Sequence, residues 1–301
     1  MKRTPPRKKP SPIKAVATVH KKGVRRKSRK KKPSKITPGA ILKYSLLILL
    51  TAFIIATGYQ YRHGFLYYLG FKTNKRIESL SKDGSSIADV RNYEIISRHS
   101  DKVFGLDVSH YQGVIKWDNI ERVKGNFPID FVFLRSTAGV DPDKKFSANW
   151  RHSKQSGFIR GAYHYYRPNE NSLKQADNFI KTVRLSKGDL PPVLDIERIS
   201  DKQSLDSLKS GIKRWLTAVE LHYGVKPIIY SGESFYTDFL KKEFKGYNLW
   251  IANYSLFEDN IRDEWLFWQF TDKGSVNGIE GKVDVNIYNG TLPQLNELLI
   301  K

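Results

Sequence analysis

The chain has 301 residues, a formal net charge of +22 and no cysteine, which excludes disulfide bonds, thiolate metal sites and cysteine nucleophiles. A charge of this size suggests nucleic acid or an anionic membrane as partner, but it is unevenly placed. Residues 1–40 hold 16 Lys and Arg and no Asp or Glu, whereas residues 102–301 hold 28 basic and 25 acidic residues. The basicity therefore belongs to an N-terminal tail, and the rest of the chain is nearly neutral.

Residues 1–39 are rich in Lys, Arg, Pro and Ser and carry almost no large apolar side chains. Such a segment buries too little apolar surface to offset the entropy lost on ordering, so we predict a disordered, basic, cytoplasmic tail. Its densest run, residues 21–32, could contact anionic lipid or nucleic acid. The interpretation we prefer is a topology signal, because an apolar run follows immediately.

That apolar run extends from Ile41 to about Tyr59, and we predict a transmembrane helix over residues 40–60. At about 18 residues, the run is near the minimum for crossing ~30 Å of hydrocarbon. The alternative is a cleaved signal peptide, whose basic region would be shorter and whose cleavage site residues 55–59 match poorly. The positive-inside rule predicts a single-pass membrane anchor with a cytoplasmic N-terminus. Residues 61–101 would form a juxtamembrane stalk, with the remainder extracytoplasmic, or periplasmic if an outer membrane is present.

From Val103 onward, the chain repeats a short apolar run, a polar residue and a helical stretch. We predict eight strands, at residues 103–109, 131–135, 160–165, 192–197, 227–230, 249–253, 265–270 and 283–286. Helices are clearest over residues 173–183 and 205–223, where apolar side chains recur every three or four residues. Alternating strands and helices indicate parallel βαβ units. Residues 102–301 are thus predicted to be a domain of the α/β class, a (β/α)8-type barrel that is somewhat irregular in its last units, where connections are short.

In such barrels the chemistry lies at the C-terminal ends of the strands. The polar residues at the predicted ends are Asp107, His164, Asp195, Glu197, Tyr230, Asn253, Gln269 and Asp284. Asp195 and Glu197 are two residues apart on a strand, so both carboxyls should point to one face. Two neighbouring negative charges raise at least one pKa, which would keep Glu197 protonated as a general acid near neutral pH. A spacing of about 6.6 Å lies between the retaining and inverting ranges, so the stereochemistry stays open.

These segments together resemble the glycoside hydrolase family 25 lysozymes, the Chalaropsis-type muramidases. The resemblance rests on residues 105–113, 161–164, 195–197, 227–231, 249–254, 268–271 and 283–286, which follow the family's order. It implies a barrel that cleaves the β-1,4 bond between N-acetylmuramic acid and N-acetylglucosamine in peptidoglycan glycan strands, with no cofactor and no metal. Glu197 would be the general acid, and Asp195 would stabilise the oxocarbenium-like centre or orient the N-acetyl group. Asp107 and Asp284 would complete the acidic cluster.

The candidate substrate-binding residues complete the predicted cleft. They are His164, Tyr165, Tyr230, Trp250, Asn253 and Gln269. A core role is about as frequent for any one aromatic side chain, and a buried histidine is more often a hydrogen-bonding residue than a proton shuttle.

One position departs from the family pattern. Family members commonly carry Lys-Ala-Thr-Glu-Gly after the second strand, whereas residues 135–139 here are Arg-Ser-Thr-Ala-Gly, with Ala138 in place of the Glu. The alternative function is therefore a membrane-anchored peptidoglycan-binding module with weak or no catalysis. A chitinase-like hydrolase fits less well, because it would show a longer run of spaced Asp residues before the Glu. For a tethered enzyme we expect a role in remodelling the cell's own wall.

Overall fold

The computed structural model describes residues 38–60, 87–120, 122–123 and 127–301. Nearly all of the predicted basic tail, and the part of the predicted stalk at residues 61–86, lie outside the described residues. The chain divides into two compact units, Met1–Ala56 and Thr57–Lys301.

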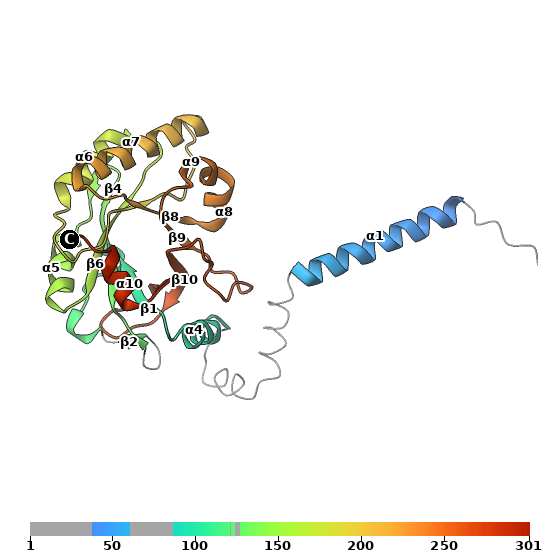
Figure 1. The fold of residues 1–301 in the computed structure, drawn as a ribbon, viewed down its shortest axis with the longest axis horizontal. Coiled ribbons are helices and arrows are strands. Elements are labelled where there is room, and N and C mark those ends of the chain that lie inside the picture. The colour runs from blue at the N-terminus through green and yellow to red at the C-terminus, as the bar shows by residue number, and fades with distance from the viewer. Residues whose placement is uncertain (1–37, 61–86, 121, 124–126) are drawn as a thin grey trace, which may run out of the picture. The chain divides into compact units, whose positions relative to one another are not determined.

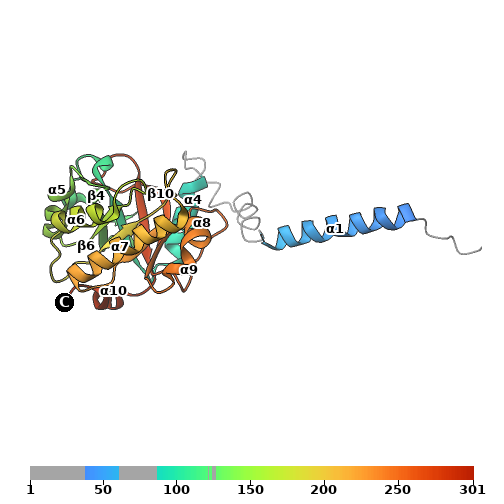
Figure 2. The same ribbon diagram turned by 90° about the horizontal axis from the view of Figure 1, so that it is seen from above.

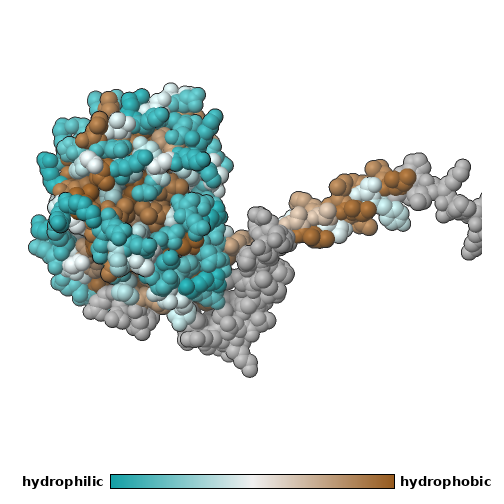
Figure 3. Space-filling model, viewed as in Figure 1, coloured by the Kyte–Doolittle hydropathy of each residue, from teal (hydrophilic) through white to brown (hydrophobic). Residues whose placement is uncertain are grey.

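Helix α1, Pro38–Gln60, is apolar over most of the surface that Figure 3 shows. No helix within the described ranges is long and apolar enough to cross a membrane. The prediction of a transmembrane helix over residues 40–60 is therefore wrong, and the single-pass anchor that rested on it is not supported. The physical reason is length: Lys43 interrupts the apolar run, and the uncharged part of α1 after it, residues 44–60, rises only about 25 Å at 1.5 Å per residue, short of the ~30 Å hydrocarbon core.

The second unit is built on eight strands that close into a barrel (Figures 1 and 2), as predicted. They are β1 (Val103–Val108), β4 (Phe131–Ala138), β6 (Ile159–Tyr165), β7 (Val193–Asp195), β8 (Ile228–Gly232), β9 (Leu249–Ala252), β10 (Phe267–Gly274) and β11 (Val283–Tyr288). The ring closes because β1 pairs in parallel with β4 and antiparallel with β11. Strand β11 is also antiparallel to β10 and so departs from the parallel prediction. A parallel return needs a crossover of a dozen or more residues, and the link between β10 and β11 is shorter.

Three short strands lie outside the ring. β5 (Asp141–Pro142) pairs antiparallel with the end of β4, and β2 (Arg122–Val123) pairs with β3 (Phe127–Pro128).

Helices α5 (Phe146–Gln155), α6 (Ser172–Thr182) and α7 (Leu205–Tyr223) lie on the outside of the barrel (Figure 1). The last two confirm the predicted helices. Local chemistry sets their ends: the Asn171 side chain accepts hydrogen bonds from the first amides of α6, and Gly224, at φ 67°, ends α7 in the left-handed conformation. The remaining helical turns are η1 (His110–Gln112), η2 (Trp117–Asn119), α8 (Glu233–Phe235), the π-helical η3 (Tyr236–Leu240) and α9 (Lys241–Phe244).

Helix α4, Ile87–Arg98, falls within the range predicted as stalk. It nevertheless packs onto the barrel: Ile95 and Ile96 are buried, and Arg91 Nη1 donates a 2.6 Å hydrogen bond to the Phe270 carbonyl oxygen. The folded domain therefore begins before residue 102.

Side chains alternate across the barrel wall over most of each strand, as the period of two in a strand requires, and β4 shifts register between Arg135 and Thr137. Phe131 and Phe133 on β4 point inward, whereas Val132 and Leu134 pack outward against the helices. The inward rings need room, which Gly105 provides on β1: a Cβ there would lie 2.3 Å from the Phe131 ring. Helix α10 (Leu292–Leu298) adds a buried leucine to the inner cluster, so the end where the strands begin is filled. The opposite end, where the parallel strands finish, is available for a binding or catalytic site.

Candidate active site

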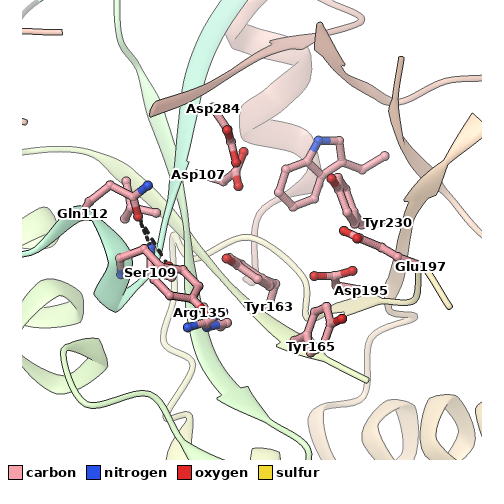
Figure 4. A pocket seen from close by; sticks show the side chains of 13 residues that line it. Asp107, Ser109, Gln112, Arg135, Tyr163, Tyr165, Asp195, Glu197, Tyr230 and Asp284 are labelled. Atoms are coloured by element: carbon pink, nitrogen blue, oxygen red, sulfur yellow. Dashed lines mark hydrogen bonds between the residues drawn. The ribbon is translucent and has the colours of Figure 1, made fainter. Parts of the chain in front are cut away.

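A pocket of about 180 Å³ opens at the C-terminal ends of the parallel strands (Figure 4). It is lined by Asp107, Val108, Ser109, Tyr111, Gln112, Arg135, Tyr163, Tyr165, Asp195, Glu197, Tyr230, Trp250 and Asp284. The structure thus brings the four predicted carboxylates into one pocket. Three of the six predicted substrate-binding residues, the aromatic ones, also line it.

Asp107 and Asp284 form one half of the acidic cluster. Asp107 is buried, and its Oδ2 accepts hydrogen bonds from Gln269 Nε2 at 2.7 Å and Asn286 Nδ2 at 2.8 Å. Burial raises the pKa of Asp107 to about 6 although these amides favour its charge. Burial, together with the charge of Asp107, raises the pKa of Asp284 to about 9. At neutral pH the two carboxyls therefore share one proton and one negative charge between them.

Asp195 and Glu197 form the other half. Asp195 ends β7 and is buried, and its Oδ1 has no hydrogen-bond partner among the described residues. Burial raises the pKa of Asp195 well above its usual range, and the charges of Glu197 and Asp107 raise it further.

Glu197 is an exposed residue, but its carboxyl turns toward Tyr230 and Asp195 (Figure 4). Loss of hydration there raises the pKa of Glu197, although a hydrogen bond with Asp195 and the charge of Arg198 lower it. Two adjacent carboxyls whose pKa values are both raised favour sharing a proton between them. Such a pair can supply both a proton donor and a negative charge to one substrate bond.

A chain of hydrogen bonds ties the two halves together. Gln269 is buried, and its Oε1 accepts from Tyr230 Oη at 2.6 Å and from Tyr254 Oη. Trp250 is also buried; its Nε1 donates to Asn286 Oδ1 at 2.8 Å, and its ring stacks on Phe133 with centroids 4.4 Å apart. Gln269 and Trp250 therefore help to fix the position of the acidic cluster from the barrel interior. Of the two, only Trp250 also lines the pocket.

Two predicted substrate-binding residues lie elsewhere. His164 is fully buried on the outer side of the wall, where Nδ1 contacts Thr137 Oγ1 at 2.7 Å and the ring stacks on Trp215. Burial lowers the pKa of His164 to about 3, so it stays neutral. Its assignment as substrate-binding is corrected for a simple reason: neighbours on a strand face opposite sides, and Tyr163 and Tyr165 take the inner one. Asn253 follows β9 and hydrogen-bonds Glu233 in a separate pocket.

Residues that the sequence did not single out complete the pocket. Tyr163 could have been found from its two-residue spacing to Tyr165. Arg135, near the end of β4, had no such signal, because contacts that only the fold creates place it: its Nε donates to Asp143 Oδ2 at 3.0 Å, and His110 contacts the same oxygen at 2.8 Å. These contacts lower the pKa of Asp143, and the charge of Arg135 opposes the upward shift at Asp195.

Within the described part of the chain, no group of three or more His, Asp or Glu side chains is arranged to hold a metal ion.

Comparison with known proteins gives a family match, two related proteins and a similar solved structure. Residues 106–279 match the family described as glycosyl hydrolases family 25. The chain is 41% identical over 211 residues to the uncharacterized protein YegX of Escherichia coli K12, covering 68% of this chain and 76% of that one. It is 31% identical over 210 residues to lysozyme M1 of Streptomyces globisporus, covering 64% of this chain and 70% of that protein. The crystal structure of a bacterial lysozyme from Streptomyces coelicolor is similar with a TM-score of 0.59 and 29% identity, over 65% of this chain and 96% of that chain.

Proposed function

The chain belongs to the glycosyl hydrolases family 25 and is a peptidoglycan hydrolase, and we propose that Glu197 is the acid with which it cleaves the glycan strand. The bond cut is the β-1,4 bond between N-acetylmuramic acid and N-acetylglucosamine, as in a muramidase. One observation carries the assignment of roles. The pKa values of Asp195 and Glu197 are both raised, but Glu197 faces the open pocket, whereas Asp195 lies buried beneath it.

Access decides which carboxyl delivers the proton. Burial raises the pKa of Asp195 further than that of Glu197, but only Glu197 can reach the glycosidic oxygen of a strand lying in the pocket. Once Glu197 donates, the bond between the anomeric carbon and that oxygen breaks, and positive charge develops on the sugar ring. Asp195, relieved of the shared proton, carries the negative charge that stabilises this ring, with Asp107 behind it. Water then adds to the anomeric carbon and returns a proton to Glu197.

The substrate sets where the enzyme works. Peptidoglycan lies outside the cytoplasm, so we place the barrel of residues 102–301 there and assign it to remodelling of the cell wall. Separating cytoplasmic from extracytoplasmic protein and probing each fraction for the barrel tests this location.

The test of the function is product analysis. The purified full chain is incubated with isolated peptidoglycan, and the released fragments are identified by mass spectrometry, alongside Glu197→Gln. Fragments ending in reducing N-acetylmuramic acid, absent with this variant, are the expected result. Glu264→Gln removes an exposed carboxyl away from the pocket and should cleave like wild type. No release while the protein still sediments with the wall would favour the alternative, a peptidoglycan-binding module without catalysis.

A further inference from the structure

A second pocket, of about 820 Å³, adjoins the first at the barrel mouth. The two pockets share Tyr111, Arg135, Tyr165 and Glu197 in their walls. The second extends from Glu197 across the ends of β4 and β6 to the short strand β5. A glycan strand bound at the carboxylates therefore lies directly beside it.

This second pocket carries four cationic side chains, which differ in how far they are neutralised. Arg135 is paired with Asp143, and Arg167 Nη1 contacts Asp141 at 2.7 Å and Glu170 at 3.1 Å. The other two, Lys144 and Arg198, are exposed and have no carboxylate within ion-pair distance among the described residues.

The remaining wall does not compensate for these two charges. Ala138, at the end of β4, lines the same pocket and carries no charge. Glu197 is the carboxyl of this wall on which the charge of Arg198 acts, and the raised pKa of Glu197 reduces its negative charge. The pocket therefore has two unneutralised cations beside the bond that is cut.

We infer that this cationic pocket binds a carboxylate of the substrate, carried by the stem peptide attached to the glycan strand. The inference rests on the proposed function, because it places the glycan in the adjoining pocket. Guanidinium groups bind carboxylates through paired, charge-assisted hydrogen bonds, and a lysine ammonium adds a point charge. A branch hanging from the bound strand would enter this pocket without leaving the glycan. The enzyme would then select peptide-bearing strands.

The experiment compares three substrates with the full chain. They are glycan strands with native stem peptides, the same strands with peptide carboxylates converted to amides, and strands stripped of peptides, which expose the lactyl carboxylate. The variant Lys144→Gln/Arg198→Gln removes the two unpaired cations. Lys213→Gln/Arg151→Gln removes the same charges from the outer helices α7 and α5 and is the control.

For the double variant we expect KM on native strands to rise about tenfold, or about 1.4 kcal/mol, with kcat unchanged. On amidated strands both constants should stay within about twofold of wild type, at a pH where Glu197 keeps its proton. Wild type should cleave stripped strands with a higher KM than native strands. Equal KM values on the two would mean that the bound carboxylate is the lactyl group instead. Equal KM values for native and amidated strands in wild type, or equal losses on both in the variant, would overturn the inference.

A second pair of variants tests the same charge from the opposite direction. Ala138→Glu adds a negative charge to the pocket and should raise KM on native strands, whereas Ala138→Gln, of nearly the same size, should not. Equal effects of the two would count against the inference. Direct binding is measured in parallel, so a wild type that cleaves nothing yet binds native strands better than amidated ones would refute the proposed function and support this inference.

Discussion

Replacing Asp195 by Asn removes a buried carboxyl, one oxygen of which has no hydrogen-bond partner in the part of the chain that the structure describes. Its raised pKa shows that the folded protein resists charge at this position. We therefore expect Asp195→Asn to increase the free energy of unfolding at neutral pH by about 1–2 kcal/mol, because Asn has no buried carboxyl to ionise; a gain of this size is usual for a single stabilising substitution. In a domain of this size, that corresponds to roughly 2–4 °C in Tm per kcal/mol. Activity should fall about 100- to 1,000-fold, because the charge that stabilises the reacting sugar is lost.

The gain in unfolding free energy of Asp195→Asn over wild type should increase with pH. Below the ordinary pKa of aspartate, about 3.9, the folded and unfolded chains both keep the proton on Asp195. As the pH rises, the unfolded chain ionises first, so wild type loses stability until the raised folded pKa is passed. Asn has no such loss. The stability difference should therefore be small near pH 4 and largest near pH 8.

Thermal unfolding followed by circular dichroism at about pH 4, 6 and 8 measures this difference. Asp189→Asn is the matched control, because Asp189 is as buried but is paired with Arg160 at 2.8 Å. Breaking that pair should destabilise by about 3 kcal/mol, with the opposite sign. If Asp195→Asn were less stable than wild type at pH 8, or if the difference were the same at every pH, the reasoning would be refuted.

Three further changes test the site and its support. Arg198→Gln should move the alkaline limit of activity to higher pH, because the charge of Arg198 lowers the pKa of Glu197, which must stay protonated; an unmoved limit in the pH–rate profile on amidated strands contradicts this. His164→Leu should lower the unfolding free energy by about 1–3 kcal/mol, since it orphans buried polar partners, and leave kcat unchanged; a fall in kcat would indicate a catalytic role. Gly105→Ala should destabilise by about 1–3 kcal/mol or more, because its Cβ would lie 2.3 Å from the Phe131 ring; a Tm equal to that of wild type would show that the ring can move.

Much of the barrel was predictable because its strands and helices follow from short-range patterns of apolar and polar residues. Each strand is a short apolar run with a polar tip, and all eight were placed correctly. The spacing of Asp195 and Glu197 predicted that both carboxyls face one side, and Asp107 and Asp284 were found at other strand ends. The same period, applied consistently, would have placed Tyr163 in the pocket and His164 outside it. Helix α1 shows the limit of such patterns: its apolar composition predicted a membrane span, but no helix among the described residues is long and apolar enough to make one.

Tertiary structure alone decided the rest, because it depends on which distant segments meet. The pairing of β11 with β1 joins the two ends of the barrel sequence, and the place of Asn253 in another pocket and the contact of Arg135 with Asp143 arise between side chains that only folding brings together. The gathering of cations beside Glu197 has the same origin. The order of the pKa values also depends on the surroundings, since two aspartates of identical chemistry, Asp107 and Asp284, differ in burial and in the amides and charges that the fold brings to them. A sequence lists which groups can ionise, but only the surroundings that folding creates determine which of them hold a proton.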